Sequence, residues 1–172
     1  KSARIGALWP AAYNFFVSNK ITGSFIKKMA GFAVERSMPE LYKTTLAKWM
    51  KGRKTINSDT ANRKGRKVYL FCDEFTNYND STIGIAAVKL MERLGYEVII
   101  PDHMESGRAW LSKGLLREAQ KIANRNISLL SPVISADTPL IGIEPSAILT
   151  FRDEYIDLAR DDQFEAAKVL SK

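Results

Sequence analysis

Four side chains with metal-binding or proton-transfer chemistry follow three separate apolar segments of this sequence. Cys72 follows the first segment, His103 and Glu105 follow the second, and Glu144 follows the third. A thiolate, an imidazole and carboxylates can together hold a divalent metal ion, and a histidine beside a carboxylate can act as a general base. The alternative is a small buried cysteine and a solvated loop histidine. The acidic Asp73 next to Cys72 disfavours a reactive thiolate.

The residues after the second apolar segment are also typical of a helix N-terminus that binds an anion. Ser106 is suited to cap a helix, Gly107 follows it, and Arg108 adds a guanidinium that can bind a carboxylate or phosphate. Free N–H groups at such a helix start attract anions. A plain helix cap, with Glu105 at the positive end of the helix dipole, explains the same residues equally well.

The residues after the third apolar segment repeat this arrangement. Glu144, Pro145 and Ser146 are typical of the start of a second helix, with proline in its first turn. Arg152 lies two turns further on, and we expect it to pair with a nearby acid such as Glu144. A role for Arg152 in binding substrate is the alternative.

The elements that must position these side chains alternate between strand and helix. Short apolar runs at 67–71, 96–100 and 140–143 predict three strands, and the residues 72–80 predict a polar loop. Helical patterns follow at 82–94, 107–130, 147–158 and 162–170. In the first of these, Ile83, Ala87, Leu90 and Leu94 recur at helical spacing, and Gly95 is its expected end.

This order predicts an α/β fold, with a small parallel sheet built from βαβ units in a Rossmann-like arrangement. Because right-handed βαβ crossovers place every strand-to-helix loop at the same edge of the sheet, the three loops should meet there. We therefore expect one shallow site that contains Cys72, Glu105, Ser106 and Glu144. Two carboxylates in one site need a counterion or a shared proton, so an arginine or a bound cation is expected between the glutamates.

The first 65 residues are predicted to be a separate, short helical segment that is strongly basic. Residues 1–67 carry a net charge of +12 and residues 68–172 a net charge of −5. The two domains are therefore expected at 1–65 and 66–172, with a polar basic linker at 52–67. The positive charge suits nucleic acid, an anionic membrane or an acidic protein surface, or belongs to a solvated linker. Because no aromatic stacking array accompanies it, we expect no specific nucleic-acid binding.

The composition indicates a globular domain in a reducing compartment. Of the 172 residues, 45% are hydrophobic and 26% are charged, and the only cysteine excludes an internal disulfide framework. No apolar run approaches the roughly 18 residues that a membrane span requires. Since the sequence begins with Lys1 and ends at Lys172 inside a helical pattern, we expect it to be a piece of a longer chain.

Three sequence motifs lie around the second and third loops and along the long predicted helix. They are L-G-Y-E-V before the second loop, S-K-G-L-L-R-E-A-Q-K-I-A-N-R-N after it, and G-I-E-P-S-A-I-L-T-F-R-D-E-Y at the third. With Cys72, these motifs resemble the cysteine-rich (CCG) domain of the glycolate oxidase iron–sulfur subunit. Related domains occur in anaerobic glycerol-3-phosphate dehydrogenase and in heterodisulfide reductase. The wider resemblance is to fused FAD-linked oxidases of the D-lactate dehydrogenase type.

The resemblance implies a degenerate metal site. Cys72 stands at the first cysteine position of the family, Glu105-Ser106-Gly107 replaces Cys-Cys-Gly, and Glu144-Pro145-Ser146-Ala147 replaces Cys-Pro-Ser-Cys. Because thiolates hold iron–sulfur clusters, we expect no cluster and no complete active site in this piece. These positions are nevertheless the candidate cofactor-binding residues, with Cys72 as the remaining metal ligand.

The resemblance also implies a function for the parent protein, namely oxidation of a small 2-hydroxy acid such as D-lactate or glycolate. FAD and iron–sulfur clusters would lie in the rest of that chain, and this piece would be a structural or electron-transfer-associated module. Its expected partners are a flavin domain, a ferredoxin-like domain and a second cysteine-rich copy. The expected location is the cytoplasm, or the inner face of the membrane through peripheral association of the parent.

Overall fold

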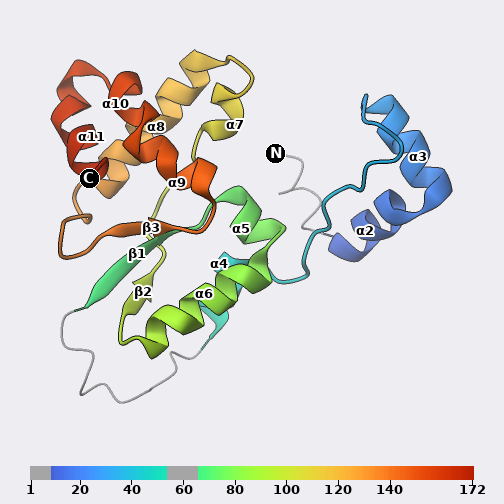
Figure 1. The fold of residues 1–172 in the computed structure, drawn as a ribbon, viewed down its shortest axis with the longest axis horizontal. Coiled ribbons are helices and arrows are strands. Elements are labelled where there is room, and N and C mark those ends of the chain that lie inside the picture. The colour runs from blue at the N-terminus through green and yellow to red at the C-terminus, as the bar shows by residue number, and fades with distance from the viewer. Residues whose placement is uncertain (1–8, 54–65) are drawn as a thin grey trace.

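The computed structural model describes residues 9–53 and 66–172, and Figure 1 shows them as a small α/β body with a helical arm. The predicted linker at 52–67 and the predicted domain boundary at residue 65 lie largely outside the described residues. The helices are α2 (Pro10–Ser18), α3 (Lys20–Met29), α4 (Leu46–Gly52), α5 (Glu74–Tyr78), α6 (Ser81–Arg93), α7 (Arg108–Leu111), α8 (Leu116–Leu130), α9 (Pro145–Arg152), α10 (Glu154–Leu158), the 3-10 helix η2 (Asp161–Gln163) and α11 (Phe164–Leu170).

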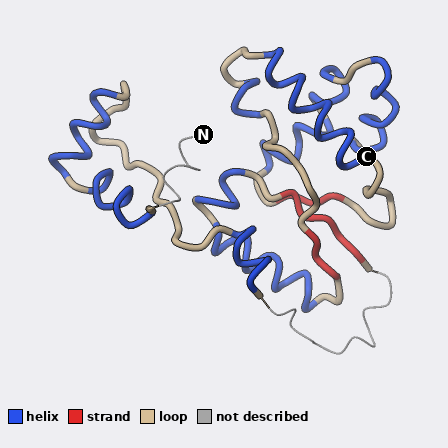
Figure 2. The backbone as a smooth tube through the Cα atoms, turned by 180° about the vertical axis from the view of Figure 1, so that it is seen from behind, coloured by secondary structure: helices blue, strands red, loops and turns tan. Residues whose placement is uncertain are grey.

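Three parallel strands form the sheet of the body, in the order β2-β1-β3. They are β1 (Lys67–Phe71), β2 (Glu97–Ile99) and β3 (Leu140–Gly142), which confirms the predicted strands and the predicted fold class. The central strand β1 pairs with both neighbours, and its alternate side chains enter the two layers of helices. Figure 2 shows the sheet from behind, with the helices on either side of it.

Each face of the sheet carries its own hydrophobic core. On one face, Phe71 packs with residues of α8, α9, α10 and α11, among them Ile127, Phe151 and Tyr155. On the other face, Leu70 and Val98 of the sheet pack with residues of α4 and α6. Burial of these apolar side chains is the main contribution that holds the helices against the sheet.

The predicted helix at 107–130 is wrong as a single element, because it breaks between Leu111 and Leu116. Gly114 adopts a φ of 71°, which L side chains rarely adopt, and the Leu115 N–H donates to the carbonyl oxygen of Trp110 at 3.0 Å. This is the hydrogen bond of a Schellman motif, which ends α7. The predicted helix at 147–158 is likewise divided into α9 and α10.

The prediction of an irregular loop at 72–80 is also wrong, because this segment contains the short helix α5. The Asp73 carboxylate caps the helix by accepting hydrogen bonds from the N–H groups of Phe75 and Thr76, both at 2.9 Å. Aspartate is among the preferred N-cap residues, and its carboxylate satisfies N–H groups that have no partner inside the helix.

Helix α6 begins and ends close to the predicted residues, but its apolar stripe does not face the sheet. Ile83, Leu90 and Leu94 are all more than half exposed, whereas Gly84 is buried. A Cβ atom added at Gly84 would lie only 2.6 Å from a methyl group of Leu46 on α4. Close packing of α4 at Gly84 therefore turns another face of α6 inward, on which Ser81, Gly84, Val88 and Glu92 are buried.

Helices α2 and α3 form an arm that extends away from the body (Figures 1 and 2). The Asn14 side chain joins it to the body, because it donates to the Leu41 carbonyl at 2.8 Å and accepts from the Leu41 N–H at 2.9 Å. Within the described parts of the chain, no helix is long and apolar enough to cross a membrane.

Candidate functional site

The carboxyl ends of the three parallel strands lie at one edge of the sheet, which we call the rim. Cys72 follows β1, residues 101–107 follow β2, and Glu144 follows β3. Several hollows open along this rim in the described part of the chain, and two of them contain most of the candidate residues. The first encloses about 520 Å³ and is lined by Cys72 and His103, and the second encloses about 280 Å³ and is lined by Ser106 and Glu144. The candidate residues are thus at one edge but do not share one hollow, because Glu105 lines a third, of about 670 Å³, together with Glu74.

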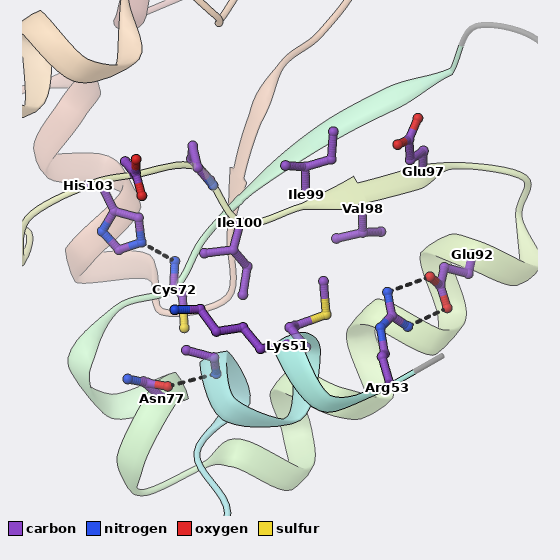
Figure 3. Close-up of a pocket in the computed structure, with 14 residues that line it drawn as sticks. Lys51, Arg53, Cys72, Asn77, Glu92, Glu97, Val98, Ile99, Ile100 and His103 are labelled. Atoms are coloured by element: carbon purple, nitrogen blue, oxygen red, sulfur yellow. Dashed lines mark hydrogen bonds and ion pairs between the residues drawn. The ribbon is translucent and has the colours of Figure 1, made fainter. Parts of the chain in front are cut away.

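The imidazole of His103 is held by a hydrogen bond at each ring nitrogen. Its Nε2 accepts from the Cys72 N–H at 3.2 Å, and its Nδ1 lies 2.6 Å from the carbonyl oxygen of Met104 (Figure 3). Since an amide N–H only donates and a carbonyl only accepts, the proton must be on Nδ1 and the ring is neutral. Burial lowers the pKa of His103, which further favours this form. The histidine joins two rim loops and has no free lone pair for a metal ion.

The thiol of Cys72 is buried and remains protonated at neutral pH. Burial, with a smaller contribution from the negative charge of Asp73, raises the pKa of Cys72 to about 12. Iron–sulfur clusters are held by several thiolates, and Cys72 is the single cysteine of this sequence. Within residues 9–53 and 66–172, no three histidine, cysteine or acidic side chains lie close enough together to hold a metal ion.

The first hollow lies between α4 and the edge strand β2, with Lys51 at its border (Figure 3). Three of its polar side chains are engaged in structural contacts. Arg53 forms a two-point ion pair with Glu92 at 2.7 and 2.9 Å, and the Asn77 Oδ1 accepts from the Ala47 N–H at 3.0 Å. These contacts connect α4 to α5 and α6, and Lys51, Glu97 and Asp102 are further charged residues that line the hollow.

The second hollow contains two helix starts whose side chains cap their own helices. The Glu144 carboxylate accepts from the hydroxyl of Ser146 at 2.8 Å and from its N–H at 3.3 Å, and Pro145 occupies the first turn of α9. The Ser106 hydroxyl accepts from the Arg108 N–H at 3.2 Å. The backbone cap of α7 is Gly107, with a φ of 81°, rather than Ser106.

The arginines of the rim do not lie between Glu105 and Glu144, contrary to expectation. Arg108 pairs with Glu154, and Arg152 pairs with its neighbour Asp153 at 2.8 Å. Glu105 instead accepts a hydrogen bond of 2.5 Å from the indole N–H of Trp110. Each arginine therefore pairs with an acid on α10 or directly before it. Glu105 and Glu144 each have a different partner.

Glu74 is a rim residue that the sequence reasoning missed as a site candidate. It lines the second hollow, and its Oε2 is buried without a hydrogen-bond partner among the described residues. Burial raises the pKa of Glu74, and the nearby carboxylates of Glu105 and Asp73 raise it further. The only signal in the sequence is the adjacent pair of acids, Asp73 and Glu74, directly after a strand.

Asn126 and Tyr155 fix the second rim loop from inside the protein, and neither was a sequence candidate. The Asn126 Oδ1 accepts from the Met104 N–H at 2.7 Å, and its Nδ2 donates to the Glu105 carbonyl at 2.9 Å. The Tyr155 hydroxyl accepts from Asn126 at 2.8 Å and donates to the Ser106 carbonyl at 2.9 Å. A buried asparagine in the middle of a helix is the signal that could have indicated this network.

The fold and the rim define a small α/β domain with strand-end loops gathered at one edge. The chain is similar to D-2-hydroxyglutarate dehydrogenase of Escherichia coli K12, with 28% identity over 153 residues. The corresponding enzymes of Pantoea ananatis and Haemophilus influenzae are 27% and 26% identical. These matches cover 83–85% of this chain but only 14–15% of each relative. No family model matches the chain, and no solved structure does.

Proposed function

We propose that this chain is one segment of a longer FAD-linked oxidoreductase that oxidises a D-2-hydroxy acid. The observation that carries the proposal is the similarity to proteins named D-2-hydroxyglutarate dehydrogenase, which extends over 85% of this chain. Their name makes D-2-hydroxyglutarate the first substrate to test, ahead of the D-lactate and glycolate that the motifs suggest. FAD and iron–sulfur clusters would belong to the remainder of the polypeptide.

Within that protein, we infer that the segment is a structural module beside the electron-transfer domains and has no cluster of its own. The single cysteine supports this role, because a cluster is held by several thiolates and Cys72 is buried. The capped helices and ion-paired arginines of the rim support it as well, since their polar groups already have partners inside the domain. The neighbours of the module would be the flavin domain, the ferredoxin-like domain and a second cysteine-rich copy, in a cytoplasmic enzyme.

Anaerobic reduction of the flavin in the longer protein tests the proposed activity. Addition of D-2-hydroxyglutarate should bleach the flavin absorbance, while the L-enantiomer, as a matched control, should not. D-lactate and glycolate, tested in the same way, show which other 2-hydroxy acids the protein oxidises. A flavin that no D-2-hydroxy acid reduces would contradict the proposal.

The inferred structural role has its own test, which is a Cys72→Ala variant of the longer protein. Because Cys72 is expected to bind no iron, the variant should retain the iron content and the electron-transfer rate of the parent. A loss of iron from the folded variant would show that Cys72 is a ligand and would contradict the inferred role. Circular dichroism of both proteins checks that the variant is folded.

A further inference from the structure

The arm, defined here as residues 9–36, exposes an unusual number of large apolar side chains. Trp9 and Ile21 are 80% and 82% exposed, and Phe15, Phe25 and Met29 are 64%, 65% and 76% exposed. On α3, Ile21, Phe25 and Met29 are spaced four residues apart and therefore share one face. Exposed apolar groups that gather in this way mark an interaction surface.

The arm has almost no core of its own. Of the residues in its two helices, only Val17 and Gly23 are buried. The helices meet at Gly23, where an added Cβ atom would lie 2.5 Å from the Val17 carbonyl oxygen, so their backbones are in direct contact. Helices of 9 and 10 residues are marginal in water without packing. Packing within the arm therefore contributes little to its stability, and its exposed apolar side chains are open to contact with another surface.

The size of the exposed area is that of a protein interface. A large apolar side chain has about 200 Å² of accessible surface when it is fully exposed to solvent. Scaled by the exposed fractions of its large apolar residues, the arm presents on the order of 800 Å² of apolar surface. This equals one partner's share of a standard protein–protein interface. The residues that contribute most are Trp9, Phe15, Phe16, Ile21, Phe25, Ile26, Met29 and Phe32.

The charge of the arm limits what surface can cover it. The arm contains Lys20, Lys27, Lys28 and Arg36 and one acid, Glu35, so its net charge is +3 (four basic residues minus one acidic). A complementary surface must therefore be apolar where it meets the aromatic side chains and acidic at its border.

We propose that the arm docks onto another part of the same longer polypeptide, on an apolar surface with an acidic border. This proposal rests on the proposed function, because the relatives extend far beyond the 15% of their length that this chain matches. A segment that is tethered to its binding surface experiences an effective concentration of the order of millimolar, which no separate partner matches. The Asn14–Leu41 clamp orients the arm and leaves its apolar face open to that surface.

Hydrogen–deuterium exchange of the longer protein tests this docking. The amides of residues 10–30 should exchange slowly in the unmodified protein, because docking protects both helices. The variants Ile21→Asp and Phe25→Asp place a charge on the docked face and should speed this exchange at least tenfold. Ala30→Asp introduces the same charge at an exposed position beyond that face and should leave exchange unchanged. Exchange in β1 and α8 should be the same in all four proteins.

Three outcomes would overturn the proposal. Rapid exchange of the arm in the unmodified protein would show that nothing covers it. Protection that is lost on dilution, together with dissociation of a dimer in light scattering, would assign the surface to a second copy. Protection that appears only with vesicles containing phosphatidylglycerol would assign it to an anionic membrane.

Oxidation of D-2-hydroxyglutarate, measured on the same samples, separates this proposal from the proposed function. An active protein with an unprotected arm would refute the docking alone. An inactive protein with a protected arm would refute only the proposed activity.

Discussion

Asn126 is expected to be the most sensitive single position of the rim, and Asn126→Ala tests this. Its amide is fully buried and makes hydrogen bonds to Met104, Glu105 and Tyr155. The substitution removes all three at once and leaves the N–H of Met104 and the carbonyl of Glu105 without this partner. The loop that contains His103 would then lose its attachment to α8.

The expected cost follows from the hydrogen bonds lost. Each one contributes about 1 kcal/mol net, and a buried group left unpaired costs about 1–3 kcal/mol more. We therefore expect Asn126→Ala to lower the free energy of unfolding by about 3 kcal/mol. Tyr155→Phe should cost about 1.5 kcal/mol, because Asn126 keeps its bonds to Met104 and Glu105. The double variant should cost less than the sum of the two, since both remove the same bond.

Urea unfolding of the chain, followed by circular dichroism, measures these differences. Arg125→Ala is a matched control on the same helix, because Arg125 is exposed, and its effect should stay within about 0.5 kcal/mol. A cost below about 1 kcal/mol for Asn126→Ala would refute the reasoning. Full additivity in the double variant would show that the Asn126–Tyr155 hydrogen bond contributes nothing.

Three further predictions concern titratable groups. Because burial holds the pKa of His103 below 6.5, the unfolded chain binds a proton that the folded chain does not, and the free energy of unfolding should fall as the pH falls below 6.5. His103→Phe should reduce this dependence of the unfolding free energy on pH, measured by urea unfolding at several pH values. A pH dependence as steep as that of the unmodified protein would contradict the prediction. The raised pKa of Glu74 means that its ionised form is disfavoured in the folded state. Glu74→Gln should therefore raise the melting temperature at pH 7 but not below pH 4.5. If the variant and the unmodified protein melt at the same temperature at pH 7, the ionised form of Glu74 is not disfavoured in the folded state. Glu92→Ala leaves the charge of Arg53 buried and should cost about 3 kcal/mol. Glu97→Ala, at an exposed ion pair, should cost under about 1 kcal/mol in the same unfolding experiment.

Local patterns in the sequence were sufficient to predict the sheet and its rim. Short apolar runs identified the three strands, and the intervening helical segments required parallel pairing. Gly95, with a φ of 89°, follows the end of α6 as expected. Strand runs and helix ends depend on neighbouring residues, so periodicity and backbone preferences contain enough information to find them.

Only the tertiary structure decided which side chains face inward and which groups pair. The inner face of α6 depends on how closely Leu46 approaches Gly84, and a hydrophobic pattern does not contain that distance. The partner of Arg108 is 46 residues away, and His103 binds the backbone of Cys72 across 31 residues. Such contacts follow from how the helices pack on the sheet, because packing selects one partner among several acids or amides of the same chemical type.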